Sequence, residues 1–445
     1  MKTLILGGGL AGITLARLLS QKGDNVSVLE QESRIGGLCR SVTADGFTFD
    51  IGGSHIIFSR DTQVLSFMHQ VLGKNRGERK RDTKIHYKNR YIRYPFENGL
   101  YELPKEDCYT CLNEFIRTLI ATEKGELKEP ENFLEWIHHT FGSGIAEAYL
   151  VPYNEKIWNF PLDRMSAHWM EGRVPRPPVE DIIRSAVGIE TEGYRHQSVF
   201  SYPAEGGIEA LITAIAAPVS ECIRCGFTVR SITKTEDGWE VGDGKEVITA
   251  DRLISTIPLQ VLLPCLSGVP GEVADAVAAL KYNSIVCVGI GLTGSTLPFS
   301  WMYLPERDGS AANRISFPSN FSDQAAPPGC SSILAEITYN QGDATDLMTD
   351  AGVVEETIRS LGKAGILDPA AVRSAIAVRH RFAYVVYDLD WKKNMKTIRE
   401  YFSSLDLPLV GRFSQFEYLN MDGVIRSVQD FAGDDVHGLR RTRRV

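Results

Sequence analysis

The feature that most restricts how this 445-residue chain can fold is a glycine-rich loop near its beginning, Gly7-Gly8-Gly9-Leu10-Ala11-Gly12. A short apolar run precedes the loop, and apolar residues follow it at helical spacing: Ile13, Leu15, Ala16, Leu18 and Leu19. The order strand, tight turn, helix is typical of a dinucleotide-binding unit. In such a unit Gly7 permits the turn, Gly9 lets a phosphate approach the backbone, and Gly12 lets the helix lie against the strand. The pyrophosphate then meets N–H groups at the helix N-terminus.

A second predicted strand, residues 25–29, ends at Glu30, eighteen residues after Gly12. A carboxylate at this place accepts hydrogen bonds from ribose hydroxyls and repels a 2′-phosphate, which favours FAD or NAD over NADP. The competing interpretation is a glycine turn in an unrelated α/β unit. The strand, the helix and the acidic residue together favour the dinucleotide site.

The segment after Glu30 distinguishes a flavin from a nicotinamide. It contains a glycine pair followed by a basic residue, namely Gly36, Gly37, Leu38 and Arg40. This arrangement resembles the second fingerprint of FAD enzymes in the amine oxidase and glutathione reductase superfamily. Residues 47–55 then alternate like a strand and end in glycines, so we expect Gly53 and Ser54 to bring main chain against the isoalloxazine ring. FAD is therefore the predicted cofactor.

Composition narrows the class of partner. The net charge is -8 and 43% of the residues are hydrophobic, and at this length two or three packed domains are expected. An acidic chain argues against a nucleic-acid or anionic-membrane surface. No stretch approaches the roughly 18 apolar residues of a membrane span, and the N-terminus lacks the pattern of a signal peptide. We therefore expect a cytoplasmic protein with a small-molecule substrate.

Two cysteine pairs have the spacing of metal or redox dithiols, Cys108 with Cys111 and Cys222 with Cys225. A four-thiolate zinc site would have to join pairs that are far apart in the sequence, and neither pair lies in a glycine-rich knuckle. We expect no metal site, and expect the thiols to serve as small hydrophobic side chains.

Four further blocks carry a resemblance to a known family. They are residues 52–59 with His55, residues 94–107 with Phe96 and Glu97, residues 152–175 with Asn154, Trp158 and Arg173, and a C-terminal set with Tyr303, Arg314, Tyr387, Gly411, Arg412, Tyr418, Asn420 and Met421. Their order and residue types resemble the UDP-galactopyranose mutases, most closely the eukaryotic branch. The resemblance extends from residue 3 to about residue 425.

For the cofactor, the resemblance implies that His55 lies beside the flavin, near its reactive N5. It also implies that Gly411, Arg412, Asn420 and Met421 return to the flavin domain and contact FAD. Ser54 makes the spacing between glycine and histidine one residue longer than the family pattern. A histidine that merely satisfies its own loop is the alternative.

For the substrate, the resemblance implies contacts from Phe96, Glu97, Asn154, Trp158, Arg173, Tyr303, Arg314, Tyr387 and Tyr418. A diphosphate suits two guanidinium groups, which neutralise its charge, and phenolic hydroxyls, which donate at fixed angles. Tyr384 competes with Tyr387 for one of these roles. Glu97 stands where the family has glutamine, and an ionised carboxylate cannot reproduce the amide's donor and acceptor on uracil, so guanine is an alternative base.

The predicted fold class is α/β, with a discontinuous Rossmann-like FAD-binding domain, a helical domain and a mixed or antiparallel β-sheet domain. The expected boundaries are residues 1–80, 200–265 and 405–435 for the FAD-binding domain, 100–199 for the helical substrate and lid domain, 81–99 with 275–400 for the sheet domain, and 436–445 for a basic tail. Strand-like runs at residues 285–291, 332–338 and 375–382 predict the sheet.

The family resemblance implies an isomerase that interconverts UDP-galactopyranose and UDP-galactofuranose, with N5 of reduced FAD as the nucleophile at the anomeric carbon. Arg173 and Arg314 would stabilise the departing diphosphate, and residues 169–178 would form a lid. NAD(P)H is a candidate reductant and a homo-oligomer a candidate assembly.

Three alternatives stay open. The first is a mutase for another UDP- or GDP-linked sugar. The second is an FAD-dependent oxidase of the amine oxidase or protoporphyrinogen oxidase type, which would need an apolar substrate tunnel. The third is a non-catalytic binding protein on the same scaffold, as in the GDP dissociation inhibitors.

Overall fold

The computed structural model describes residues 1–168, 178–191, 199–306 and 309–436. A four-stranded parallel sheet with the order β13-β1-β2-β9 contains the N-terminal strand. Its strands are β1 Lys2–Leu6, β2 Asn25–Leu29, β9 Ile223–Arg224 and β13 Arg252–Ser255. After Lys2, β1 is fully buried, which is the pattern of a parallel strand covered on both faces.

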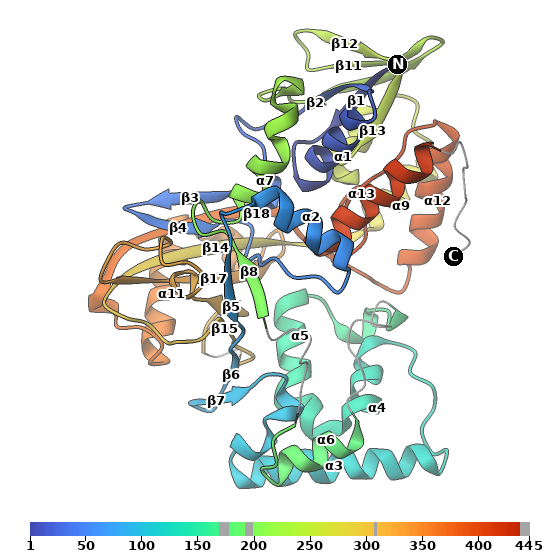
Figure 1. Ribbon diagram of the computed structural model, residues 1–445. Helices are drawn as coiled ribbons and strands as arrows, with labels where there is room; N and C mark the ends of the chain where they lie inside the picture. Colours follow the sequence, from blue (N-terminus) through green and yellow to red (C-terminus); the bar gives the residue numbers. More distant parts are fainter. Residues whose placement is uncertain (169–177, 192–198, 307–308, 437–445) are drawn as a thin grey trace.

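Helices from distant parts of the chain pack beside this sheet (Figure 1). They are α1 Leu10–Gln21, α2 Thr62–Leu72, α7 Glu209–Ala216 and α13 Met421–Val436. Helix α1 contacts both α7 and α13, and α2 contacts α7. The side chain of Asp61 caps α2 by accepting from the N–H groups of Gln63 and Val64. One dinucleotide-binding unit is thus assembled from the beginning, middle and end of the chain.

Smaller elements surround this unit. There are two antiparallel strand pairs and one three-stranded sheet. The pairs are β3 Ser41–Ala44 with β4 Phe47–Asp50 and β5 Gly77–Lys80 with β8 Val199–Tyr202, and the sheet contains β10 Ser231–Thr235, β11 Gly238–Gly242 and β12 Val247–Ala250. The accompanying helices are α8 Leu259–Leu262, α9 Gly271–Ala279 and α12 Trp391–Ser404. Helix α12 packs against α9.

A seven-stranded mixed sheet with the order β18-β14-β17-β16-β15-β6-β7 forms the second part of the molecule. Its strands are β6 Thr83–Tyr87, β7 Arg90–Arg93, β14 Lys281–Thr293, β15 Trp301–Tyr303, β16 Arg314–Ser316, β17 Cys330–Tyr339 and β18 Val372–Val386. Helices α10 Ala344–Leu347 and α11 Asp350–Lys363 follow β17. A Cβ at Gly289 or Gly291 of β14 would lie 2.6 or 2.5 Å from the ring of Phe49 or Phe47, so these glycines let β4 lie flat on the sheet.

The helical part lies at the end of the molecule opposite β1 and β2 (Figure 1). It contains α3 Lys105–Glu123, α4 Phe133–Ile145, a π-helical turn Ala146–Leu150, α5 Val151–Trp158 and α6 Val179–Ala186. Glycine lets α3 and α4 approach closely, because a Cβ at Gly144 would lie 2.7 Å from the Cα of Cys111. Pro152 follows the π-helical turn and lacks the N–H that a regular helix would use there.

The predicted α/β fold class is confirmed, and the three predicted strand runs lie inside β14, β17 and β18. Each strand extends beyond its predicted run at both ends. Residues 83–93 join the sheet built by residues 281–386 through the parallel pairing of β6 with β15. Within the described part of the chain, no helix is both long enough and apolar enough to cross a membrane.

Candidate functional site

The glycine loop has the geometry that a bound pyrophosphate requires. Gly7 adopts a φ of 101°, which L side chains rarely adopt. A Cβ at Gly12 would lie 1.9 Å from the carbonyl oxygen of Gly7, so only glycine lets α1 start this close to the end of β1. A Cβ at Gly9, in contrast, would meet nothing within 4 Å. The space beside Gly9, at the N-terminus of α1, is open to an anion.

Glu30 ties the end of β2 to this loop. Its buried carboxylate accepts from the N–H of Gly8 at 2.6 Å with Oε2 and from the N–H of Glu32 at 2.9 Å with Oε1. Each oxygen keeps a further lone pair for a ribose hydroxyl. The arrangement fits a carboxylate that recognises the ribose of a dinucleotide.

Residues 36–40 lie directly against the loop. Gly36 donates to the carbonyl of Gly8 at 2.9 Å, and Gly9 and Gly36 form a bridge of the parallel type. Gly36 and Gly37 have φ values of 119° and 55°. The partly buried Arg40 donates from Nε to the carbonyl of Gly37 at 3.3 Å. Arg40 thereby holds a positive charge next to the open space beside Gly9.

The C-terminal segment closes against the same loop. Gly411 has a φ of 93°, and a Cβ there would lie 2.6 Å from the Cβ of Ala11. Arg412 donates from Nη1 to the carbonyl of Leu419, directly before the exposed Asn420 and the buried Met421 that begins α13. The segments in which the sequence predicts cofactor contacts therefore meet around α1.

The loop after β4 carries the residues expected to face the flavin. Gly53 has a φ of 102°, and the N–H of Ser54 donates to Oε1 of Glu336 at 3.0 Å. The Ser54 Oγ is buried and has no hydrogen-bond partner within the described residues. Nδ1 of His55 donates to the carbonyl of Gly53 at 2.8 Å, which leaves Nε2 as an acceptor. An orphaned hydroxyl beside a glycine turn fits a bound cofactor.

Burial lowers the pKa of His55 to about 4, although the neighbouring carboxylate of Glu336 raises it. The charges of Arg412 and Arg314 lower it further. His55 is therefore a neutral imidazole at ordinary pH. It can accept a proton or a hydrogen bond but contributes no charge.

Arg314 and Glu336 form a buried ion pair between the adjacent strands β16 and β17, where they are direct partners in register. Arg314 donates from Nε at 3.0 Å and from Nη2 at 2.7 Å, one bond to each carboxylate oxygen. The side chain of Glu336 has no exposed surface, whereas that of Arg314 is 22% exposed. Since a guanidinium has five N–H donors and Glu336 takes two, three remain for a ligand.

The electrostatic setting keeps Arg314 charged. Burial alone would lower the pKa of Arg314, but the charge of Glu336 and the nearby phenols of Tyr384 and Tyr303 raise it well above its ordinary value. Buried ion pairs hold their charge when both partners are well hydrogen-bonded. The guanidinium is thus a fixed cation next to the loop that carries Ser54 and His55.

Two tyrosines and a second arginine adjoin this cation. The rings of Tyr384 and Tyr418 stack at 5.9 Å, and the guanidinium of Arg412 lies 5.3 and 4.7 Å from their centroids. The edge of Trp158 packs against both rings, at 6.0 and 5.7 Å. Burial and the charge of Glu336 raise the pKa of Tyr384 above the usual range, so its hydroxyl stays a donor.

The structure favours Tyr384 over Tyr387 for a role at this cation. The hydroxyl of Tyr387 accepts from the backbone N–H of Tyr418 at 2.6 Å, and its ring packs on Trp391 at 4.7 Å. Tyr384 instead lies close enough to Arg314 and Glu336 to feel their charges. The predicted contact from Tyr387 stays a prediction, and the alternative, Tyr384, is the tyrosine that the structure places next to the Arg314–Glu336 pair.

Asn154 and Trp158 lie one turn apart on α5 and bond to each other. The Nε1 of Trp158 donates to Oδ1 of Asn154 at 2.9 Å, while Nδ2 of Asn154 donates to the carbonyl of Leu150 at 2.8 Å. Their predicted contacts with a nucleotide stay predictions. In this conformation the Asn154 amide orients the indole against the two tyrosines.

An aromatic ladder leads away from Arg314. Tyr303 is its partner in register on β15, and Tyr153 packs edge-on against Tyr303 at 5.0 Å. Tyr153 then stacks on Tyr149 at 5.4 Å, and Tyr149 stacks on Phe96 at 5.1 Å. The ladder ends beside Glu97, which follows Phe96 in the chain and is also buried.

Arg173, the other arginine predicted to bind a diphosphate, lies outside the described residues, as does the greater part of the predicted lid. The cations that the structure places at the site are Arg314 and Arg412. Among the described residues, no group of three or more His, Cys, Asp or Glu side chains could hold a metal ion.

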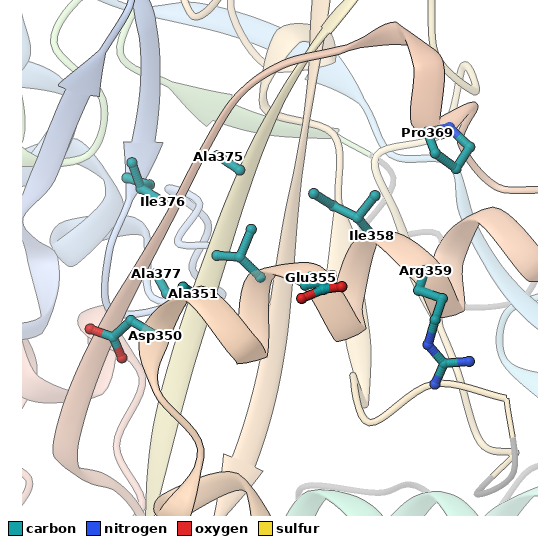
Figure 2. A pocket seen from close by; sticks show the side chains of 10 residues that line it. Asp350, Ala351, Glu355, Ile358, Arg359, Pro369, Ala375, Ile376 and Ala377 are labelled. Atoms are coloured by element: carbon teal, nitrogen blue, oxygen red, sulfur yellow. The ribbon is translucent and has the colours of Figure 1, made fainter.

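A separate cavity of about 750 Å³ lies between α11 and the edge strand β18. Figure 2 shows Ile358, Glu355 and Arg359 of α11 along it, opposite Ala375 and Ile376 of β18. Its lining is mostly aliphatic and includes none of the residues that the sequence singles out. We therefore place the functional site at the glycine loop and Arg314.

Sequence reasoning missed Glu336 and Asp50. Glu336 is the only charged residue of β17 and lies between apolar neighbours, a signal that could have identified it. Asp50 is fully enclosed and accepts from Ser41 Oγ, Tyr202 Oη and the N–H of Ile208. Burial raises the pKa of Asp50 to about 6. These two carboxylates hold the segments that surround the site.

Comparisons with known proteins agree with this geometry. A crystal structure of reduced UDP-galactopyranose mutase matches with a TM-score of 0.89 and 28% identity, over 99% of this chain and 96% of that one. A putative protoporphyrinogen oxidase from Exiguobacterium sp. 255-15 shares the fold, with a TM-score of 0.76, 16% identity and coverage of 98% and 99%.

A curated relative, the dTDP-fucopyranose mutase of Escherichia coli, is 23% identical over 218 residues, which are 45% of this chain and 54% of that protein. The chain thus spans about half the length of this relative. The model of the family described as flavin containing amine oxidoreductase matches residues 10–394. The protein therefore belongs to the flavin-containing amine oxidoreductase family.

Proposed function

We propose that this protein is a flavin-dependent mutase that interconverts UDP-galactopyranose and UDP-galactofuranose. The observation that carries the proposal is the buried Arg314–Glu336 pair, which holds a guanidinium beside the loop of Ser54 and His55; among the described residues, three of its five donors have no partner. An oxidase site for an amine has no use for such a cation, because the amine substrate is itself neutral or positively charged. The likeness to a reduced UDP-galactopyranose mutase over the full chain supports the same reaction class.

The residues around the glycine loop fit FAD. Gly9 would lie against the pyrophosphate, Glu30 would accept from the ribose, and the orphaned hydroxyl of Ser54 would meet the ring system. Bound FAD, in its reduced form, supplies a nucleophilic nitrogen for the anomeric carbon of the sugar.

The chain's own residues supply binding and charge stabilisation. Arg314 would grip the diphosphate through its remaining donors, and its stabilisation grows as the leaving oxygen becomes charged. Tyr384 and Tyr418 would donate phenolic hydrogen bonds to the same group. Glu336 keeps the guanidinium aimed because it also holds the N–H of Ser54. His55, neutral at ordinary pH, would accept a hydrogen bond without adding charge.

The test uses holoenzyme reduced with dithionite under anaerobic conditions and incubated with UDP-galactofuranose. Chromatographic separation should show conversion to UDP-galactopyranose, with no consumption of reductant and no conversion by the oxidised holoenzyme. Hydrogen peroxide production from amines, together with unchanged nucleotide sugar, would favour an oxidase and overturn the proposal.

The role of Arg314 is tested by Arg314→Met together with Glu336→Gln, because the double variant removes both charges and leaves no unpaired carboxylate. Activity should fall about 100-fold or more, since hydrogen bonds to a charged leaving group contribute roughly 1.5–3 kcal/mol each. The absorption spectrum should still show bound FAD. Normal turnover by this variant would rule out Arg314 as the diphosphate ligand.

A further inference from the structure

Glu97 is a buried acid whose carboxyl group has no hydrogen-bond or ion-pair partner in another residue of the described chain. It lies in the single turn Phe96–Asn98, and only 5% of its surface is exposed. Within the described residues, its only hydrogen bond is to its own backbone N–H. A buried carboxyl group normally has hydrogen-bond partners, so this one points to a ligand.

Charged groups on the neighbouring elements are occupied elsewhere. On β7, Arg90 donates to the carbonyl of Glu102 and Arg93 to the carbonyl of Thr191. On α6, which packs against the turn, Arg184 pairs with Glu180, and Asp181 is the remaining charged group of its first turn. The phenols of Tyr149, Tyr94 and Tyr303 face the same interior. No cation among the described residues pairs with Glu97, and burial raises its pKa to about 7.

The position of Glu97 relative to Arg314 suggests the shape of the ligand. The ladder Phe96, Tyr149, Tyr153 and Tyr303 connects the two through ring contacts of 5.0 to 5.4 Å. A ligand that contacts both residues would need a flat, polar ring at the Glu97 end and an anion at the Arg314 end. A nucleoside diphosphate has both.

We propose that Glu97 reads the nucleobase as a neutral carboxylic acid, whose O–H donates to a ring carbonyl while its C=O accepts from the adjacent ring N–H. This inference rests on the proposed function, which supplies the nucleotide sugar. Uracil and thymine present such an imide edge, an N–H flanked by carbonyls. Guanine presents two N–H donors side by side, which match an ionised carboxylate instead. Glu97 therefore selects uridine or thymidine diphosphate sugars.

Protonation makes this recognition dependent on pH. Binding of an imide to the neutral acid should weaken as the pH rises through about 7, because the ionised form repels the ring carbonyls. Between pH 6 and pH 8 the neutral fraction falls about tenfold, and the Kd should rise by the same factor. Glutamine has the same shape and a permanent donor and acceptor, so Glu97→Gln should remove the dependence.

The experiment measures binding to FAD-loaded wild type, Glu97→Gln and the exposed control Glu106→Gln by titration calorimetry at pH 6 and pH 8. The ligands are UDP-galactose, dTDP-galactose and GDP-mannose, whose esterified diphosphates do not titrate in this range. At each pH the wild-type Kd is divided by the Glu97→Gln Kd, which removes the effects of other titrating groups because both proteins share them. Flavin absorption and thermal unfolding confirm that each variant is folded.

For wild type and Glu106→Gln, the Kd of the two pyrimidine nucleotides should rise about tenfold from pH 6 to pH 8. Glu97→Gln should bind them equally at both pH values. A wild-type Kd that does not change with pH, or a preference for GDP-mannose that strengthens as the pH rises, overturns the inference while leaving a mutase. If none of the three ligands binds wild type or Glu97→Gln at either pH, the mutase proposal itself fails.

Discussion

Two substitutions in the glycine loop separate what the fold needs from what the cofactor needs. At Gly12 an added methyl group would lie 1.9 Å from the Gly7 carbonyl oxygen, whereas at Gly9 it would meet no atom within 4 Å. Gly9 has φ of -78° and ψ of -176°, an extended conformation that alanine adopts without strain. Gly12→Ala should therefore damage the protein itself, and Gly9→Ala should damage only cofactor binding.

The magnitudes follow from these contacts. Forcing a methyl group into a filled site costs about 1–3 kcal/mol or more, and the 1.9 Å approach at Gly12 requires α1 to move away from β1. The free energy of unfolding of the Gly9→Ala apoprotein should lie within about 1 kcal/mol of the wild-type value, because the substitution also reduces the entropy of the unfolded chain. If the pyrophosphate occupies the space beside Gly9, the same methyl group should weaken FAD binding about 10- to 100-fold.

The assay is a titration of apoprotein with FAD, followed by quenching of flavin fluorescence, beside thermal unfolding of each apoprotein. Gly9→Ala should have the wild-type melting temperature but a lower affinity for FAD. Gly12→Ala should have both a lower melting temperature and a lower affinity for FAD. A Gly9→Ala variant that binds FAD with wild-type affinity would refute the placement of the pyrophosphate at the N-terminus of α1.

Three further predictions concern buried groups. Glu336→Gln leaves the charge of Arg314 without its counter-ion, so thermal unfolding should show that the free energy of unfolding falls by about 3 kcal/mol, with FAD still bound. Unchanged stability would show that water already screens the pair. Burial raises the pKa of Asp50 to about 6 from an ordinary 3.8, so its contribution to stability is present below about pH 4 and is lost as the pH rises through 6. In urea unfolding, the free energy of unfolding of wild type relative to Asp50→Asn should fall by up to about 3 kcal/mol between pH 4 and pH 7. A difference that stays constant with pH would contradict the raised pKa. Tyr384→Phe should lower kcat about tenfold or more, whereas Tyr387→Phe should leave kcat unchanged and cost about 1 kcal/mol of stability, and the reverse result would restore Tyr387 to the diphosphate.

The glycine loop could be predicted from the sequence because its requirements are local. Gly7 needs a positive φ, Gly12 must leave room for a carbonyl oxygen, and Glu30 follows at the end of the next strand. Each condition depends on residues that are close in the chain, and each allows only one or two residue types at its position. Apolar runs predicted β14 and β17 for a similar reason, because most side chains of a buried strand are apolar.

The partners of the site residues could not be predicted, because they depend on strand register. Arg314 and Glu336 are 22 positions apart and meet only because β16 pairs with β17 in one particular alignment. A shift of one residue would turn the carboxylate to the other face of the sheet. The choice between Tyr384 and Tyr387 has the same origin, since both are tyrosines near the end of β18 and differ in their tertiary partners, with Tyr384 packed against Trp158 and Tyr387 against Trp391.

Charge balance at the site indicates what a ligand complex still requires. Glu336 cancels the charge of Arg314, and His55 is neutral, so of these groups Arg412 alone contributes a net positive charge. A diphosphate ester brings two negative charges, and placing an uncompensated charge in a buried site is costly. Under the proposed function, a bound diphosphate therefore requires one further cation. Arg173, which the family resemblance predicts to bind the diphosphate, is the candidate for that cation, because the charge of Arg314 is already balanced by Glu336.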